Sequence, residues 1–321
     1  MQQEYTKRRK MHDVINIVLA SDNNYAQHVA VVVASVVCNT KEKVNIHLLS
    51  DGISKERLAL IAETARALGS TLSVYDMSSY ECFDNLFTSG HISKAAYFRL
   101  DIANILPKAV TKIIYMDVDL LVLQDISKLW HYDMQGKPLA AVPDYGIMAS
   151  KRLMKQKHEV IGLPLDSLYF NSGVVIMDLE QWRKHDYAKQ VIELAAVGNL
   201  PHHDQDALNK VFLGNWTALP MKWNVIPPVF NLFSKILLNG DLRKNAIAAR
   251  KDKAILHFAG RYKPWEFELH KGFNEAYYFY LQKTKFANVK MPQPGRNMKG
   301  KSITRQMARL KLADFWQWLL G

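Results

Sequence analysis

The feature that most constrains the fold is a regular alternation of strand-length and helix-length apolar runs. The chain opens with the buried-strand pattern "VINIVLA" (Val14 to Ala20), followed by a helix-length run from Tyr25 to Cys38. The same order repeats, with Ser54 placed to cap a helix that Gly69 ends, between strands predicted at Val44 to Ser50 and Thr71 to Asp76. This alternation predicts an α/β fold with a mixed, mostly parallel sheet flanked by helices.

Further strands are expected later in the chain. One continuous strand is predicted over Lys112 to Val122, with short strands at Leu139 to Val142 and Val174 to Leu179, so that the core sheet ends near residue 220. Residues 220–296 are less periodic and contain one clear strand, Ala254 to Phe258. We interpret that segment as a cover that closes a site.

Charge and cysteine content narrow the classes of protein. The net charge of +12 suits nucleic acid, an anionic membrane surface or a phosphorylated ligand, and its distribution must decide between them. Cys38 and Cys82 make neither a disulfide framework nor a zinc cluster, which favours a reducing compartment. Residues 1–13 form a polar, basic extension without the apolar core of a secretory signal, so we expect a cytoplasmic protein. The apolar run from Val29 to Cys38 is about half of the ~20 residues that span a bilayer.

Two carboxylates lie one residue apart in the apolar run "YMDVDLLV". Asp117 and Asp119 would repel each other at a strand end unless a cation lay between them, and oxygen ligands favour Mg²⁺ or Mn²⁺. The alternative is that one Asp caps the following turn and the other is solvated, and a bare D-x-D does not decide. A phosphohydrolase with Asp117 as nucleophile is also conceivable, although hydrolases of the haloacid dehalogenase type carry such a motif near the chain start.

Other polar residues gain meaning only in combination. His257 lies at the end of the strand "AILHF", and Lys263 follows six residues later. The imidazole of His257 could complete the ligand shell of a metal, and the ammonium of Lys263 could neutralise a phosphate. The alternative is that His257 is a hydrogen-bonded core residue. "HHDQDALN" places Asp204, Gln205 and Asp206 at a predicted helix start. The acids could cap the helix dipole, or these residues could recognise sugar hydroxyls and supply a group that faces an anomeric carbon. Arg99 alone is compatible with a surface ion pair, and Asn171 alone with a turn residue, so neither indicates a function by itself.

In order, seven motifs resemble those of the family 8 retaining glycosyltransferases, especially the bacterial lipopolysaccharide galactosyl- and glucosyltransferases: "LASDNNY", "HISKAAYFRL", "YMDVDLLV", "AVPDY", "YFNSGVVIMDL", "HHDQDALN" and "HFAGRYKPW". The resemblance covers roughly residues 14 to 270. It implies a GT-A fold, a Rossmann-like α/β domain that binds a sugar nucleotide, usually UDP-glucose or UDP-galactose, together with Mn²⁺.

The resemblance also implies roles for particular residues. The metal ligands would be Asp117, Asp119 and His257. The loop that holds uracil and ribose would contain Ala20, Asp22, Asn24 and Tyr25, with Tyr25 stacked on the base. The donor-sugar and reaction-centre positions would be Arg99, Asp144, Asn171, Asp204 and Gln205, with Asp144, Asp204 and Gln205 as catalytic candidates. Gly260 and Lys263 would contact the diphosphate.

The same resemblance implies transfer with retention at the anomeric carbon. Gln205 is the residue near the expected position, and its amide is a poor nucleophile, so same-face attack by the acceptor hydroxyl is favoured over a covalent intermediate. Two loops do not match the family pattern, "GIMASKRLMKQKHEVIG" and "NLFSKILLNG", so the sequence does not identify the acceptor.

The C-terminal segment explains much of the charge. From Arg296 onward the chain contains six basic residues and one acidic residue, Asp314. Ile303, Met307 and Leu310 recur at helical spacing before the aromatic end "FWQWLL". This basic amphipathic helix suits the anionic inner leaflet of a cell membrane, with an ordinary packed helix as the alternative. The predicted divisions are an extension (1–13), a GT-A domain (14–285) and a membrane-associating tail (286–321).

The sequence therefore predicts a Mn²⁺-dependent retaining hexosyltransferase, with Mg²⁺ as an alternative ion. It would move glucose or galactose from UDP to a saccharide acceptor, such as lipopolysaccharide core or another surface glycan, at the cytoplasmic face of the membrane. The competing hypotheses are a non-catalytic sugar-nucleotide or glycan binding protein and the phosphohydrolase. Nucleic acid is not expected as a partner, because no recognition motif accompanies the basic residues.

Overall fold

The computed structural model describes residues 14–84, 86, 94–198, 200–230, 240–267 and 272–288. The predicted N-terminal extension and residues 289–321 of the predicted tail lie outside the described residues, as does most of the loop "NLFSKILLNG". Within the described part of the chain, no helix combines the length and the apolar character needed to cross a bilayer.

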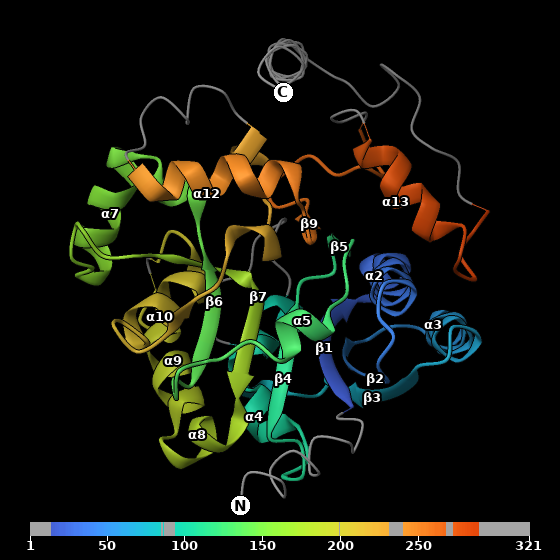
Figure 1. The fold of residues 1–321 in the computed structure, drawn as a ribbon. Helices are drawn as coiled ribbons and strands as arrows, with labels where there is room; N and C mark the ends of the chain where they lie inside the picture. Colours follow the sequence, from blue (N-terminus) through green and yellow to red (C-terminus); the bar gives the residue numbers. More distant parts are fainter. Residues whose placement is uncertain are drawn as a thin grey trace, which may run out of the picture.

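A seven-stranded sheet forms the centre of the molecule, in the order β3-β2-β1-β4-β7-β6-β8 (Figure 1). Neighbours are parallel between β3, β2, β1 and β4 and between β6 and β8, whereas β7 runs antiparallel to both β4 and β6. The predicted mixed, mostly parallel sheet is confirmed. Its strands are β1 (Ile15–Asp22), β2 (Val44–Asp51), β3 (Thr71–Asp76), β4 (Lys112–Met116), β6 (Leu139–Pro143), β7 (Phe170–Asp178) and β8 (Thr217–Ala218).

Both faces of the sheet are covered, because successive side chains of a strand point to opposite faces. Ile17 and Leu19 of β1 pack into one core with the first helices and with α12 and α13, while Val18 packs into a second core with helices from the middle of the chain. The first group comprises α2 (Ala26–Cys38), α3 (Lys55–Ala67), α5 (Ser127–Trp130), α12 (Gly240–Lys251) and α13 (Phe273–Leu281). The second comprises α4 (Ile102–Ile105), α7 (Lys151–Ile161), α8 (Leu179–Lys184), α9 (Tyr187–Ala196) and α10 (His203–Val211).

Local signals for the early elements are confirmed. The Ser54 hydroxyl accepts the Arg57 N–H at 3.4 Å and so caps α3, as predicted. Helix α2 is apolar on nearly all sides and is buried between the sheet and α13, as Figure 1 shows. The remaining short turns are η1 (Asn23–Tyr25), η2 (Glu81–Phe83), η3 (Lys94–Leu100), α6 (Tyr145–Met148), η4 (Met221–Trp223) and η5 (Pro227–Phe230).

The prediction of one strand from Lys112 to Val122 is wrong. The chain leaves the large sheet after Met116, and β5 (Leu120–Val122) pairs instead with β9 (Ile255–His257) in a separate two-stranded sheet. The segment between finds other backbone partners: the Asp117 N–H donates to the Gly173 carbonyl at 2.8 Å, and the Asp119 carbonyl accepts the Phe258 N–H at 2.8 Å. This break places both acids in a turn beside His257.

Candidate active site

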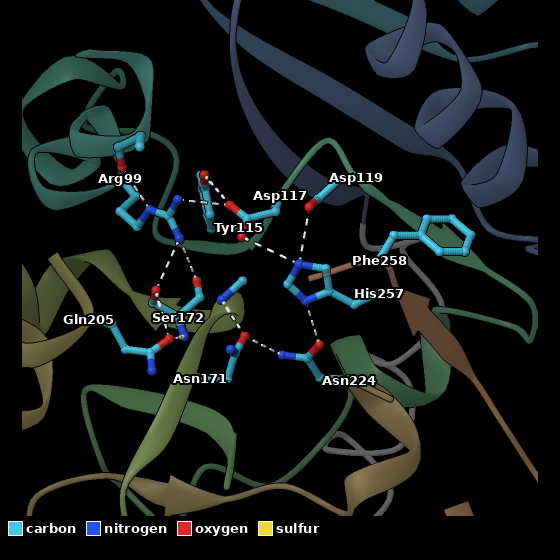
Figure 2. Close-up of polar contacts among 12 residues, drawn as sticks. Arg99, Tyr115, Asp117, Asp119, Asn171, Ser172, Gln205, Asn224, His257 and Phe258 are labelled. Carbon is cyan, nitrogen blue, oxygen red and sulfur yellow. Dashed lines mark hydrogen bonds and ion pairs between the residues drawn. The ribbon is translucent and has the colours of Figure 1, made fainter. Parts of the chain in front are cut away.

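Two acids and a histidine converge at the junction of the two sheets. The antiparallel pairing of Leu120 with His257 brings the start of β5 next to the end of β9. Figure 2 shows the His257 ring facing both acids. Its Nε2 lies 3.1 Å from Asp119 Oδ1 and 3.7 Å from Asp117 Oδ2. One ligand atom from each residue lies within 4.8 Å of the others, so the three side chains form a group that could hold a metal ion. The sequence prediction that these residues come together is confirmed.

Gly173 provides the space for this group. A Cβ atom on Gly173 would lie 2.4 Å from His257 Cε1 and 2.7 Å from Asp117 Oδ2, so any side chain there would collide with two of the three ligands. Carboxylate and imidazole donors around a cleared space suit a divalent cation such as Mn²⁺ or Mg²⁺. The residues present therefore fit a divalent metal.

Lys263 lies beside the same acids. Its ammonium pairs with Asp119 and donates to the Phe258 carbonyl at 2.8 Å. Burial alone would raise the pKa of Asp119, but the Lys263 ammonium and the His257 imidazole hold it well below its usual range. Gly260, in the turn between His257 and Lys263, has a φ of +96°, a conformation in which other residues are strained.

The segment that carries Lys263 is held against α2 by aromatic contacts. Trp265 stacks on His28, with ring centroids 3.6 Å apart, and meets the edge of Tyr25 at 5.9 Å. His28 in turn lies within hydrogen-bonding distance of Tyr277 in α13, at 2.6 Å. These contacts join the predicted base-stacking residue Tyr25 to the predicted phosphate-binding segment.

The predicted nucleoside loop lies at the carboxyl end of β1. Asp22 accepts the N–H groups of Asn24 and Tyr25 at 2.8 and 3.2 Å and so fixes η1, while Ala20 is buried within the strand. Parallel strands of open α/β sheets bind ligands at this end. The prediction that these four residues contact uracil and ribose stays a prediction.

Arg99 connects the acid pair to the predicted reaction centre. Its guanidinium is 2.8 Å from Asp117 Oδ1 and 3.3 Å from Asp204 Oδ2, and it donates to the carbonyl and hydroxyl oxygens of Ser172 at 3.0 and 3.1 Å. Because Arg99 is 5 % exposed, the alternative of a surface ion pair is wrong. Tyr115, which lies under the guanidinium, donates its hydroxyl to Asp117 at 2.9 Å.

The predicted sugar-side residues also form one network. Asp144 Oδ2 accepts from the amides of Asn171 and Gln205 at 3.0 and 3.1 Å. The Ser172 N–H donates to Gln205 Oε1 at 3.1 Å, and its hydroxyl donates to Asp204 at 3.0 Å. Burial raises the pKa of Asp204, and Arg99 partly offsets that rise. The structure thus brings Arg99 and all four sugar-side residues together.

Sequence reasoning missed several residues that build this site. Ser172 and Gly173 lie inside the motif "YFNSGVVIMDL", where only Asn171 was selected, so their position beside it was an available signal. Asn224, whose amide contacts both His257 and Asn171 at 2.8 Å, lies in the irregular stretch "KWNVIPP" and carried no pattern. Trp265 ends the motif "HFAGRYKPW", but no role was predicted for it.

The fold and the site together define a class of α/β proteins in which a D-x-D pair and a histidine converge at the end of a central strand and could hold a metal ion. Residues 16–268 match Glycosyl transferase family 8, and the chain belongs to that family. The site residues predicted above all lie within the matched range.

Known proteins and a solved structure are similar to this chain over most of its length. The chain is 32% identical over 288 residues to "General stress protein A" of Bacillus subtilis (strain 168), covering 87% of this chain and 97% of that protein. It is 26% identical over 299 residues to "Lipopolysaccharide 1,2-glucosyltransferase" of Escherichia coli, covering 92% and 83%. The crystal structure of the galactosyltransferase LgtC in complex with donor and acceptor sugar analogs superposes with a TM-score of 0.72 at 26% identity, covering 87% and 98%. The fold is GT-A, as predicted.

Proposed function

We propose that this protein is a retaining hexosyltransferase that uses Mn²⁺ to move glucose or galactose from a UDP-sugar to a saccharide acceptor. The observation that carries the proposal is the convergence of Asp117, Asp119, His257 and Lys263 beside the loop of Tyr25. A base on Tyr25 would leave the diphosphate of the donor near the acids and the ammonium. A divalent cation bound there would neutralise negative charge on the leaving diphosphate.

The side chains around the donor would then act in distinct ways. Lys263 would move from Asp119 toward a phosphate oxygen and stabilise the charge that develops on UDP. Gly260 would let the backbone approach the diphosphate closely, because nothing lies within 4 Å of its missing Cβ position. Asp144, Asn171 and Arg99 would hold hydroxyl groups of the sugar in a fixed orientation.

The network at Gln205 supports same-face attack in place of a covalent intermediate. Its amide is oriented by the Ser172 N–H and by Asp144, and an amide is a poor nucleophile. Asp204 is engaged by Arg99 and Ser172, and Asp206 has no exposed surface and is paired with Lys157. We therefore assign Gln205 to positioning and to stabilising charge at the anomeric carbon, with Asp144 bonded to its amide and Asp204 acting on it through Ser172.

The names of the relatives support a surface glycan as acceptor. One relative is named as a lipopolysaccharide 1,2-glucosyltransferase and LgtC as a galactosyltransferase, which favours lipopolysaccharide core or a related glycan. A glucose and a galactose pocket differ in contacts to one hydroxyl, so the donor must be found by experiment. Family membership favours this function over a phosphohydrolase with Asp117 as nucleophile.

The decisive experiment screens UDP-sugars for Mn²⁺-dependent release of UDP, first without an acceptor. Asp119→Ala should abolish metal-dependent release while the protein keeps a cooperative unfolding transition. The matched control is Asp252→Ala, which removes a surface carboxylate paired with Lys222 and should keep the activity. Activity that survives Asp119→Ala would contradict the site assignment, and a folded wild type that turns over no UDP-sugar would favour the non-catalytic binding protein.

A second proposal concerns the tail. We propose that residues 297–321 hold the protein on the anionic cytoplasmic face of a cell membrane, because their basic residues and aromatic end suit such a surface. Deleting 297–321 should release the protein from vesicles that contain anionic lipid, with activity on a soluble acceptor unchanged. Equal vesicle binding by the full and the shortened chain would favour an ordinary helix packed on the domain.

A further inference from the structure

Asn224 links the metal-binding group to the sugar-side network, as Figure 2 shows. It follows η4 and is 2 % exposed. One end of its side-chain amide lies 2.8 Å from His257 Nδ1, and the other lies 2.8 Å from Asn171 Oδ1. Backbone bonds hold it there, because Val225 exchanges hydrogen bonds with the strand of His257: Val225 N–H donates to Ile255 and His257 N–H donates to Val225.

A backbone donor fixes the direction of these hydrogen bonds. The Gly173 N–H donates to the Asn171 side chain at 3.0 Å, and a backbone N–H can only donate, so the atom that receives it is the carbonyl oxygen. The Asn224 atom that faces the same oxygen must therefore be its amide nitrogen. The opposite end of Asn224, its oxygen, then faces His257 Nδ1.

This direction determines which ring nitrogen can bind a metal ion. An oxygen facing Nδ1 requires Nδ1 to carry a hydrogen, so Nε2 is the nitrogen that can offer a lone pair to a cation. Nε2 is the atom that lies 3.1 Å from Asp119 and 3.7 Å from Asp117. Because carboxylates only accept hydrogen bonds, a lone pair on Nε2 can face them only with a cation in between, which is the arrangement of a metal site.

We propose that Asn224 is a positioning residue of the metal site. It holds His257 in the Nδ1–H form with Nε2 facing the acids, and through Asn171 it ties that ring to Asp144 and the donor-sugar network. This inference rests on the proposed use of Mn²⁺. The partner of a metal-binding histidine commonly sets its tautomer and orientation.

Mn²⁺ alone, without donor sugar, provides the first test. The paramagnetic resonance signal of free Mn²⁺ measures binding to the metal-free protein. Asn224→Ala removes both hydrogen bonds and should weaken binding by roughly 10- to 100-fold, the usual effect of losing such a partner. Asn224→Asp keeps an oxygen that accepts the Nδ1–H and should recover most of the affinity. It cannot donate to Asn171, so it should still raise the KM for donor sugar.

The control is Asn215→Ala, which removes an asparagine amide bonded to Tyr187 at 3.1 Å, away from the metal group, and should keep the affinity for Mn²⁺. Unfolding in EDTA should show that the Asn224 variants are folded. Mn²⁺ affinity unchanged in Asn224→Ala, with wild type binding tightly, would overturn the inference. A wild type that binds no Mn²⁺ would instead overturn the proposed metal use.

A second measurement observes the ring directly. Long-range nitrogen–proton correlation spectra of histidine-labelled wild type, saturated with diamagnetic Mg²⁺, report which ring nitrogen carries the proton. We expect the signals of His257, assigned by their loss in His257→Gln, to show the proton on Nδ1. A proton on Nε2 would contradict the proposal.

Discussion

Lys157 and Asp206 form an ion pair in which neither side chain has any exposed surface. The ammonium lies 2.7 and 2.8 Å from the two carboxylate oxygens, which also accept from the Tyr169 hydroxyl at 2.7 Å and the His202 N–H at 2.9 Å. Asp206 directly follows Gln205 in α10, whereas Lys157 comes from α7. The pair therefore fixes the helix that carries the proposed reaction-centre residues.

Removing one partner of this pair should be severely destabilising. Lys157→Met leaves the Asp206 carboxylate buried without its cation, a change that typically costs about 3–5 kcal/mol. The free energy of unfolding, measured by urea denaturation, should fall by that order. Lys155→Met is the matched control, because Lys155 is an exposed lysine of the same helix and should lose less than about 1 kcal/mol. Equal effects of the two changes would contradict the prediction.

His28 should make the stability of the domain depend on pH. Burial lowers the pKa of His28 to about 3, from a usual value near 6.5. Below about pH 6.5, His28 therefore binds a proton in the unfolded chain but stays neutral in the folded protein. The free energy of unfolding consequently decreases as pH falls from about 6.5 toward 3. Between pH 7 and pH 5 the loss from this residue is about 2 kcal/mol.

The measurement compares urea denaturation of wild type and His28→Phe, both metal-free, at pH 7 and pH 5. Phenylalanine keeps an aromatic ring against Trp265 and cannot titrate. The variant should lose less stability than wild type over this interval, by roughly 2 kcal/mol. The same pH dependence in both proteins would show that the folded protein protonates His28 as readily as the unfolded chain.

Gly173→Ala should disable metal binding with the fold intact. The added methyl would meet His257 Cε1 at 2.4 Å and Asp117 Oδ2 at 2.7 Å, so the ligands must separate. We expect at least about a tenfold loss of Mn²⁺ affinity, comparable to the loss of a partner of a ligand, measured by calorimetry. Val174→Ala changes packing in the same strand and adds no atom at the site, so it should keep the affinity.

Arg99→Lys should weaken turnover although it conserves charge. A single ammonium cannot span Asp117, Asp204 and Ser172 as the guanidinium does. Losing one hydrogen bond to a charged group, worth about 1.5–3 kcal/mol, corresponds to a fall in kcat/KM for donor of roughly ten- to a hundredfold. The assay is UDP release with Mn²⁺, and a lysine variant as active as wild type would exclude a bridging role for Arg99.

Much of the fold and part of the site could be predicted from the sequence, for identifiable reasons. Periodicity predicted β1, α2, β2, α3 and β3 nearly to their ends, because β1, α2 and β2 are strongly apolar and α3 begins at a cap and ends at a glycine. The grouping of Asp117, Asp119 and His257 came from motif order. The end of β4 after Met116 could not be predicted, because the segment "YMDVDLLV" is apolar enough to resemble one continuous strand.

Other residues escaped because their role depends on contacts distant in sequence. Lys157 lies among charged residues in "KQKHE" and looks like any surface lysine of a helix, yet it is fully buried against α10. Asn224 and Gly173 act through orientation and through empty space, which leave no periodic pattern. Such positions can be recognised only in the folded structure, where segments far apart in the sequence are in contact.

The pairing of β5 with β9 has a consequence for the newly made protein. A chain that has left the ribosome only as far as α12 already carries both acids, Arg99 and Gln205, but neither His257 nor Lys263. The site is assembled when β9 adds its strand beside β5, near the end of synthesis of the matched region. Partly synthesised chains therefore lack the complete group of two acids and a histidine, which forms only once the matched region is nearly whole.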